Sequence, residues 1–228
     1  MKSRSKRYKE LLKNKIKDKK LSLKEIFDLV KKNSNSKLEE SIDISLRINL
    51  KQSKGGDFSL RTTVKLPNGS GKKEKIAVLC EPDKISEAKN SGAEIFGSDD
   101  LIEKIATGKF NFTKLICTPA MMGKIGKHGK VLGPKGLMPN PKLGTVSNDI
   151  KKAVQNFKTG LVEIRNDKDG NLASTIGRKT YATDKLEENF KYFIDSIKKE
   201  KPDTIKGEFI KNIFITSTMG ISYKVGVK

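Results

Sequence analysis

The sequence predicts an α+β terminal domain, built from both ends of the chain around an antiparallel sheet with helices, and an α/β domain inserted between its two halves. Two observations lead to this fold class. Strands near both chain ends alternate apolar and polar residues, whereas strands in the middle are short continuous apolar runs. Alternation is typical of antiparallel sheets with one wet face, and continuous runs are typical of covered parallel sheets. We place the terminal domain at residues 1–67 and 160–228, and the inserted domain at residues 68–159.

The first part of the terminal domain is predicted to contain one helix and two strands. A capping box formed by Ser22 and Glu25 starts the helix, which carries an apolar stripe. Apolar and polar residues alternate over residues 42–50 and again over residues 60–66, so each segment should form a strand with one buried face. Because a Gly55–Gly56 turn separates the strands, we expect them to pair in an antiparallel manner.

The inserted domain is predicted to alternate strands and helices. The strands are expected at residues 76–80, 94–96 and 114–118, and the helices at residues 82–89, 99–107 and 148–158. This order requires crossover connections, so the sheet should be small, parallel and Rossmann-like.

The last part of the terminal domain returns to alternating strands. Residues 161–166 and 172–176 should form a hairpin around the turn 167–171. Thr183 is expected to cap a long helix, and a final strand follows at residues 209–216.

Two glycine-containing junctions connect the domains. The first crossing contains Pro67, Gly69 and Gly71, and the second contains Thr159 and Gly160. Such junctions absorb changes in φ and ψ, so we expect these residues to act as a double hinge.

The charge of the chain indicates a polyanionic partner. It has 48 Lys and Arg against 27 Asp and Glu, a net charge of +21, and nucleic acid is the default partner of such a chain. No acidic residue occurs between Lys104 and Asn148. Within that stretch, the segment Gly123–Val146 holds five lysines among glycines and prolines. Because these residues disfavour helices and central strands, we expect a long cationic loop that faces phosphate.

No pattern in the sequence supports catalysis, a cofactor or a metal. The only histidine, His128, has no nearby acidic residue to orient it as a general base. Residues 69–73 fail the phosphate-loop pattern, and no G-x-G-x-x-G follows the first strand of the inserted domain. Cys80 and Cys117 form no metal motif at their spacing. An RNA-processing or nucleotide-dependent enzyme stays the alternative, which nuclease and nucleotide-hydrolysis assays would test.

Folded RNA is the nucleic acid that best fits the remaining features. Four tyrosines and no tryptophan leave few platforms for stacking single strands, and no helix carries a basic recognition face. Ser217–Gly220 combines small hydroxyls with a glycine, which permits close approach to a ribose-phosphate chain, although an ordinary strand-end turn explains it about equally well. A DNA-compacting protein is a second alternative. No apolar stretch could span a membrane, and the N-terminus does not look like a secretory signal, so we expect a cytoplasmic protein.

Several motifs together resemble one known family. The segment Gly133–Val146, G-P-K-G-L-M-P-N-P-K-L-G-T-V, is similar to the signature segment of the large-subunit ribosomal protein L-one family. Further blocks occur in that family's order: K-R-Y-K at Lys6–Lys9, L-P-N-G-S-G-K at Leu66–Lys72, R-N-D-K-D-G at Arg165–Gly170 and T-S-T-M-G at Thr216–Gly220.

The resemblance covers essentially the full chain and implies a function. It implies a non-enzymatic structural constituent of the large ribosomal subunit that binds rRNA at the mobile side stalk and assists release of deacylated tRNA from the exit site. It further implies translational repression of the protein's own operon through an mRNA site that imitates the rRNA. The implied partners are large-subunit rRNA, exit-site tRNA, own-operon mRNA and other ribosomal components. We expect a monomer when free and no membrane contact.

The resemblance also assigns site residues by position. The rRNA-binding face should consist of Lys37, Leu38, Glu40, Ser41, Arg165, Lys168, Ser217, Thr218, Met219 and Gly220. The cationic segment Gly123–Val146, from its own composition, is expected to make an auxiliary RNA contact, to rRNA or tRNA, through Lys124, Lys127, His128, Lys130, Lys135 and Lys142. At two positions the chain departs from the family. Leu38 replaces a usual phenylalanine, so a flat aromatic contact becomes aliphatic, and Ala173 replaces a common histidine, so no contact is expected there.

Overall fold

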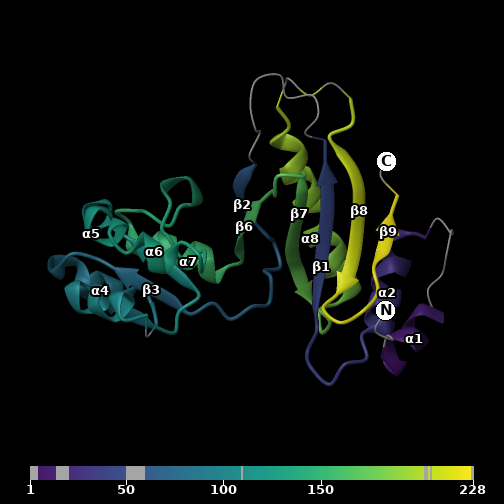
Figure 1. Cartoon of the computed structure of the whole chain (residues 1–228), viewed down its shortest axis with the longest axis horizontal. Helices are drawn as coiled ribbons and strands as arrows, with labels where there is room; N and C mark the ends of the chain where they lie inside the picture. Colours follow the sequence, from purple (N-terminus) through teal and green to yellow (C-terminus); the bar gives the residue numbers. More distant parts are fainter. Residues whose placement is uncertain are drawn as a thin grey trace. The chain divides into compact units, whose positions relative to one another are not determined.

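The structure, a computed structural model, describes residues 5–13, 21–49, 60–108, 110–202, 205 and 207–226. The chain divides into two compact units: unit 1 comprises Met1–Gly71 with Val162–Lys228, and unit 2 comprises Lys72–Leu161. Unit 1 contains an antiparallel sheet with helices and unit 2 contains a small parallel sheet, which confirms the predicted fold class (Figure 1). The predicted turn at Gly55–Gly56 lies outside the described residues.

The main sheet of unit 1 has four strands in the order β7-β1-β8-β9, with antiparallel pairing throughout. The strands are β1 (Ser41–Ile48), β7 (Asn171–Arg178), β8 (Ile210–Ser217) and β9 (Tyr223–Val225). β1 comes from the first chain segment of the unit and lies between β7 and β8 of the second segment. Its register pairs Ile42 with Ser217. The sheet therefore requires both segments of the chain.

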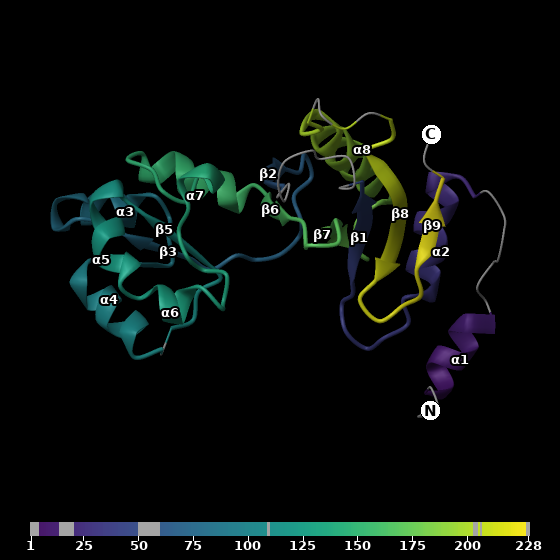
Figure 2. The ribbon, with the colours of Figure 1, turned by 45° about the horizontal axis from the view of Figure 1, so that its top comes forward.

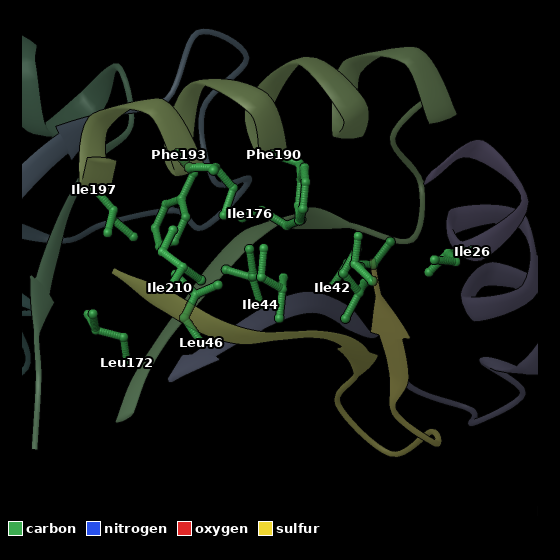
Figure 3. Packing of buried hydrophobic residues seen from close by; sticks show 14 of the residues in the cluster. Ile26, Ile42, Ile44, Leu46, Leu172, Ile176, Phe190, Phe193, Ile197 and Ile210 are labelled. Carbon is green, nitrogen blue, oxygen red and sulfur yellow. The ribbon is translucent and has the colours of Figure 1, made fainter. Parts of the chain in front are cut away.

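Helices bury one face of this sheet. Unit 1 contains α1 (Lys6–Lys13), α2 (Leu23–Asn33) and α8 (Thr183–Lys199). Figure 3 shows Phe190, Phe193 and Ile197 of α8 packed toward the inward-facing residues of β1, including Ile42 and Ile44. Burying one such side chain stabilises a fold by about 1.5–3 kcal/mol. The alternation along β1 thereby decides which of its faces meets α8.

The helix starts agree with the sequence at α2 but not at α8. At α2 the capping box is present: Ser22 N–H donates to Glu25 Oε2 at 2.8 Å, and Glu25 N–H donates to Ser22 Oγ at 3.4 Å. At α8 the prediction is wrong by one residue, because Ala182 occupies the N-cap position. The Thr183 hydroxyl instead donates to Asp28 Oδ1 of α2 at 2.9 Å, so it joins two helices and does not cap one.

Two predicted strand pairings are wrong. β2 (Arg61–Lys65) does not pair with β1, and β6 (Leu161–Arg165) forms no hairpin with β7; β2 and β6 pair with each other in a separate two-stranded sheet. β1 has both of its edges occupied by β7 and β8, so it has no edge left for β2. Asn166 ties β6 to β2, since its N–H donates to the Leu60 carbonyl at 3.1 Å and its Oδ1 accepts from Leu60 N–H.

Unit 2 is built on a three-stranded parallel sheet in the order β4-β3-β5. The elements are β3 (Ile76–Leu79), η1 (Pro82–Lys84), α3 (Ile85–Asn90), β4 (Ile95–Gly97), α4 (Asp99–Ala106), β5 (Lys114–Cys117) and α7 (Ile150–Lys158). One apolar cluster joins Leu79 and Cys117 to α4, and a second joins Val78 and Cys80 to α7. Figure 2 shows α4 and α7 on opposite sides of the sheet. Covering on both faces explains the continuous apolar runs.

The segment Gly123–Val146 is more regular than predicted. The predicted continuous loop is wrong, because the stretch contains helical turns: most of α5 (Met122–Gly126), which follows η2 (Pro119–Met121), then α6 (Gly129–Leu132) and η3 (Pro141–Leu143). Ile125 and Leu132 are fully buried in the unit 2 core. Their burial outweighs the low helix propensity of the glycines, which is about 1 kcal/mol per residue. The prolines all follow Leu132, where α6 has already ended.

Candidate nucleic-acid interface

The first residues of β1 and the last residues of β8 meet at one end of the unit 1 sheet. Ser41 N–H donates to Thr218 Oγ1 at 3.0 Å, and Thr218 N–H donates to the Ser41 carbonyl at 3.1 Å. These bonds bring together two groups of predicted site residues that are far apart in the sequence. We call this group the strand-end patch; its members are Lys37, Leu38, Glu40, Ser41, Ser217, Thr218, Met219 and Gly220.

The buried Glu40 carboxylate connects the two chain segments of the strand-end patch. The residue is 2% exposed, and its carboxylate accepts the N–H of Ser36 and the N–H of Met219, both at 3.1 Å. Burial disfavours the charged form, but hydrogen bonds from Ser217, Ser36 and Met219 outweigh it and lower the pKa of the Glu40 carboxyl to about 2. Glu40 is therefore ionised and holds the two segments together from inside.

Ser217 and Gly220 shape the turn that follows β8. Gly220 N–H donates to the Ser217 carbonyl at 3.1 Å, and Ser217 is only 3% exposed. A Cβ on residue 220 would lie 2.2 Å from Ser217 Oγ, which is closer than any real contact. A side chain at this position would therefore force the Ser217 hydroxyl to move away.

The side chains that the patch presents to solvent are mainly apolar or cationic. Among the described residues, four large hydrophobic side chains are exposed, and the patch holds two of them, Leu38 at 76% and Met219 at 51%. Lys37 is exposed between Ser36 and Leu38. Exposed apolar side chains beside a cation on a chain of net charge +21 suit a partner that offers both flat apolar surfaces and phosphates.

Several cations around the patch do not appear in the sequence-based prediction. Arg178 lies opposite Ser41 in the β1–β7 register, and its guanidinium donates to Glu39 Oε2 at 2.8 Å. Lys179 Nζ donates to the Ser34 carbonyl. Arg7 of α1 donates to the Met219 carbonyl at 2.7 Å. Arg7 falls within the block Lys6–Lys9, but Arg178 and Lys179 lie outside every block of the family resemblance, and nothing local in the sequence reveals which segments these three side chains contact.

Arg165 and Lys168 lie away from the strand-end patch. Both are exposed, at the end of β6 and in the turn that leads to β7. β7 begins opposite Arg47, whereas the patch lies at Ser41, six residues away along β1. At about 3.3 Å per residue this separation is roughly 20 Å. The predicted rRNA-binding residues therefore form two groups at opposite ends of β1.

The predicted auxiliary residues of unit 2 have different surroundings. Lys124 forms a salt bridge with Asp99 at 2.7 Å, and Lys135 lies over the Phe110 ring at 4.2 Å from its centroid. His128 is partly buried at the N-cap position of α6. The remaining members, Lys127, Lys130 and Lys142, are exposed.

Three glycines alternate with lysines along α5 and α6. They are Gly123, Gly126 and Gly129, and beyond their own helical turns a Cβ on any of them would meet no atom within 4 Å. Glycine costs about 1 kcal/mol relative to alanine inside a helix. No neighbouring atom in the described structure would exclude a larger side chain at these positions. The glycines therefore leave the helix backbone uncovered by side chains.

The predicted hinge residues at the first crossing are tied to unit 1. Asn189 of α8 is fully buried; its Oδ1 accepts from Asn68 N–H at 3.0 Å, and its Nδ2 donates to the Gly69 carbonyl at 3.0 Å. The Gly71 carbonyl accepts from Arg178 Nε at 2.9 Å. Asn189 is a residue that the sequence analysis missed. The sequence feature that could have revealed it is a single amide side chain among the apolar residues on the buried side of α8.

The described part of the chain contains no group of three or more His, Cys, Asp or Glu side chains that could hold a metal ion. Within the same ranges, no helix has the length and apolar character needed to cross a bilayer.

Comparison with known proteins gives a consistent family match. The model of the ribosomal protein L1p/L10e family matches residues 30–221. The chain is 59% identical over 197 residues to the large ribosomal subunit protein uL1 of Pelagibacter ubique (strain HTCC1062), and the match covers 86% of each chain. It is 44% identical over 227 residues to the protein of the same name from Prochlorococcus marinus subsp. pastoris, covering 100% of this chain and 96% of the relative.

Proposed function

The chain belongs to the ribosomal protein L1p/L10e family, and on that premise we propose that unit 1 binds large-subunit rRNA through the strand-end patch. The protein is a structural, non-enzymatic constituent of the large subunit and sits in the cytoplasmic ribosome. In the patch, Lys37, Leu38 and Met219 are exposed and available to RNA, whereas Glu40 and Ser217 are buried.

One observation carries this proposal: two flexible apolar side chains project from a rigid polar frame. Glu40 fixes the Met219 amide from inside, and hydrogen bonds between Ser41 and Thr218 fix the strand ends. A frame that is already ordered loses little further entropy on binding. Met219 and Leu38 then pack on ribose or base surfaces of a folded RNA, while Lys37 neutralises phosphate.

Met219→Ala tests the proposal. The lost apolar contact is worth about 1.5–3 kcal/mol if the side chain is buried by RNA, so affinity for a transcript of the side-stalk rRNA should fall at least about 10-fold. Tyr192→Ala is the matched control, because Tyr192 is 48% exposed and lies on α8, outside the patch. If Met219→Ala and Tyr192→Ala both bind like the wild type, the strand-end patch is not the rRNA site.

Salt dependence and competition separate this function from general attraction of a basic chain to polyanions. Neutralising about five phosphates predicts a log–log slope of the binding constant against salt of roughly −4. Arg165 and Lys168 would contribute from the other end of β1, so changing both to glutamine should make the slope shallower. A DNA-compacting protein would bind duplex DNA as tightly as the rRNA transcript, and a competition titration distinguishes the two functions.

We further propose that unit 2 makes an auxiliary RNA contact through the segment Gly123–Val146. The support is the exposure of Lys127, Lys130 and Lys142, together with bare glycine backbone that lets phosphates approach closely. Replacing the three lysines with glutamine should leave binding to an isolated side-stalk transcript nearly unchanged. The same variant should reduce crosslinking to exit-site tRNA on the ribosome. Unchanged crosslinking would show that these lysines do not contact the tRNA.

Assistance in releasing deacylated tRNA would use movement between the units. We propose one joint at the first crossing, which contains Pro67–Gly71, and a second joint at Thr159–Gly160. Because Asn189 and Arg178 hold residues 68–71 to unit 1, bending at the first crossing should occur beyond Gly71. An engineered disulfide that locks both joints without changing tRNA release would refute this role.

Repression of the protein's own operon would use the same patch. An mRNA site that imitates the rRNA should compete with the side-stalk transcript for one site on a monomeric protein. Met219→Ala should then weaken both RNAs by the same factor, and light scattering would check that the free protein is monomeric. Loss of rRNA binding with unchanged mRNA binding would show that repression, if present, uses another surface.

A further inference from the structure

Helix α1 is attached to unit 1 through its apolar side. Leu11 is 3% exposed in the unit 1 core, and the half-buried Tyr8 and Leu12 pack against the same cluster. An isolated helix of 8 residues is unstable in water, so this attachment is what holds α1 in place. The docking fixes the position of Arg7, which lies on the same helix beside Tyr8.

The Arg7 guanidinium joins the two chain segments of the strand-end patch. Its Nη2 donates to the Met219 carbonyl at 2.7 Å, and its Nη1 donates to Asn35 Oδ1 at 3.1 Å. Asn35 precedes the segment that contains Lys37 and Leu38, whereas Met219 lies in the turn after β8. One side chain from the N-terminal helix thus spans both sides of the patch.

The backbone of Met219 is consequently held at both of its polar groups. Its N–H donates to the buried Glu40 carboxylate at 3.1 Å, and its carbonyl accepts from Arg7. Two ionised groups of opposite sign therefore fix the backbone that aims the exposed Met219 side chain. Charge-assisted hydrogen bonds are roughly twice as strong as neutral ones, so they resist reorientation of this residue.

We propose that Arg7 is a positioning residue of the rRNA site, and that α1 is therefore a third element of that site beside the ends of β1 and β8. The inference rests on the proposed rRNA-binding function of the patch. Its chemistry favours arginine, because a planar guanidinium can donate to two separate acceptors at once, whereas a lysine ammonium is a point charge without that fork.

The test compares variants of the full chain in binding to the side-stalk rRNA transcript. Arg7→Lys keeps the charge but loses the fork, so affinity should fall about 5- to 20-fold while the salt slope stays unchanged. Asn35→Ala removes the second acceptor without altering charge and should weaken binding by a smaller factor. The matched control is Lys9→Gln, an exposed cation on the same helix, which should change affinity only through a salt slope shallower by at most about 1.

A double-mutant cycle and hydrogen exchange distinguish positioning from a direct phosphate contact. Once Met219 is truncated to alanine, Arg7→Lys should have little further effect, and in Arg7→Lys alone the Met219 amide should exchange faster. Wild-type-like binding by Arg7→Lys, or full additivity with Met219→Ala, would overturn the inference. If Arg7→Lys folds poorly, the same two measurements on Asn35→Ala, its RNA affinity and the exchange rate of its Met219 amide, test the inference instead. Failure of the wild type to bind the transcript would refute the proposed function itself.

Discussion

Replacing Glu40 with glutamine should destabilise unit 1 by about 3 kcal/mol at neutral pH. The folded state lowers the pKa of the Glu40 carboxyl from 4.5 to about 2. Each pKa unit corresponds to about 1.36 kcal/mol, which gives the quoted magnitude. Because the folded pKa is depressed, this stabilisation is fully present above pH 4.5 and is lost as the pH falls toward 2. Glutamine has nearly the same shape but carries no charge, and its amide nitrogen cannot accept the N–H of Ser36 or Met219.

Amide hydrogen exchange of β1 and β8 measures this effect within unit 1 alone, without requiring the whole two-unit chain to unfold in one step. The difference between wild type and Glu40→Gln should be largest at pH 7 and should shrink steadily below pH 4.5. Glu39→Gln is the matched control, because Glu39 pairs with Arg178 at the surface and such pairs contribute at most about 1 kcal/mol. A stability difference that is absent at pH 7, or that stays constant down to pH 2.5, would refute the assigned role of Glu40.

Three further predictions concern other parts of the fold. Gly220→Ala should lower the stability of unit 1 by about 1–3 kcal/mol in thermal unfolding, because its methyl group would overlap Ser217 Oγ, and an unchanged melting temperature would contradict the close packing. Asn189→Ala should cost about 3 kcal/mol in urea unfolding, since it removes the donor to the buried Ile176 carbonyl and to the partly buried Gly69 carbonyl; a loss below 0.5 kcal/mol would show that water replaces the amide. Burial raises the pKa of the Cys117 thiol to about 12, so iodoacetamide at pH 8 should label it only in denaturant, and rapid labelling of the native protein would contradict its burial.

The fold class was accessible from the sequence because the period of apolar residues reports how each strand is buried. Residues 42–50 alternate apolar and polar side chains, and residues 76–80 do not. In the structure β1 alternates buried and more exposed residues, whereas every residue of β3 is buried. Strand pairing was less accessible. Turn residues near 167–171 indicate a chain reversal, which is present, but they do not tell which neighbour the following strand chooses. That choice depends on contacts such as Asn166 with Leu60, which are distant in the sequence.

The candidate site was foreseeable in its location but not in its internal roles. The family resemblance assigns Glu40, Thr218 and Met219 to one site, and the structure brings them to one end of the sheet. The sequence alone cannot show that Glu40 is buried while Met219 is exposed, because neighbouring side chains decide both. Arg7 was part of a recognised block but carried no predicted role, since its partners lie 28 and 212 residues away.

The position of β1 between β7 and β8 has a consequence for synthesis of the chain. Ile42 of β1 pairs with Ser217 of β8, 175 positions later, so β1 cannot complete its pairing until β8 has been synthesised. Chains emerge from the ribosome N-terminus first, at about 5–20 residues per second, so β1 is exposed for about 10 s or more before its partner is translated. Closing a loop of this length is also entropically costly. Premature termination anywhere before β8 would therefore yield a product unable to form the strand-end patch, and incompletely translated copies would be excluded from assembling subunits.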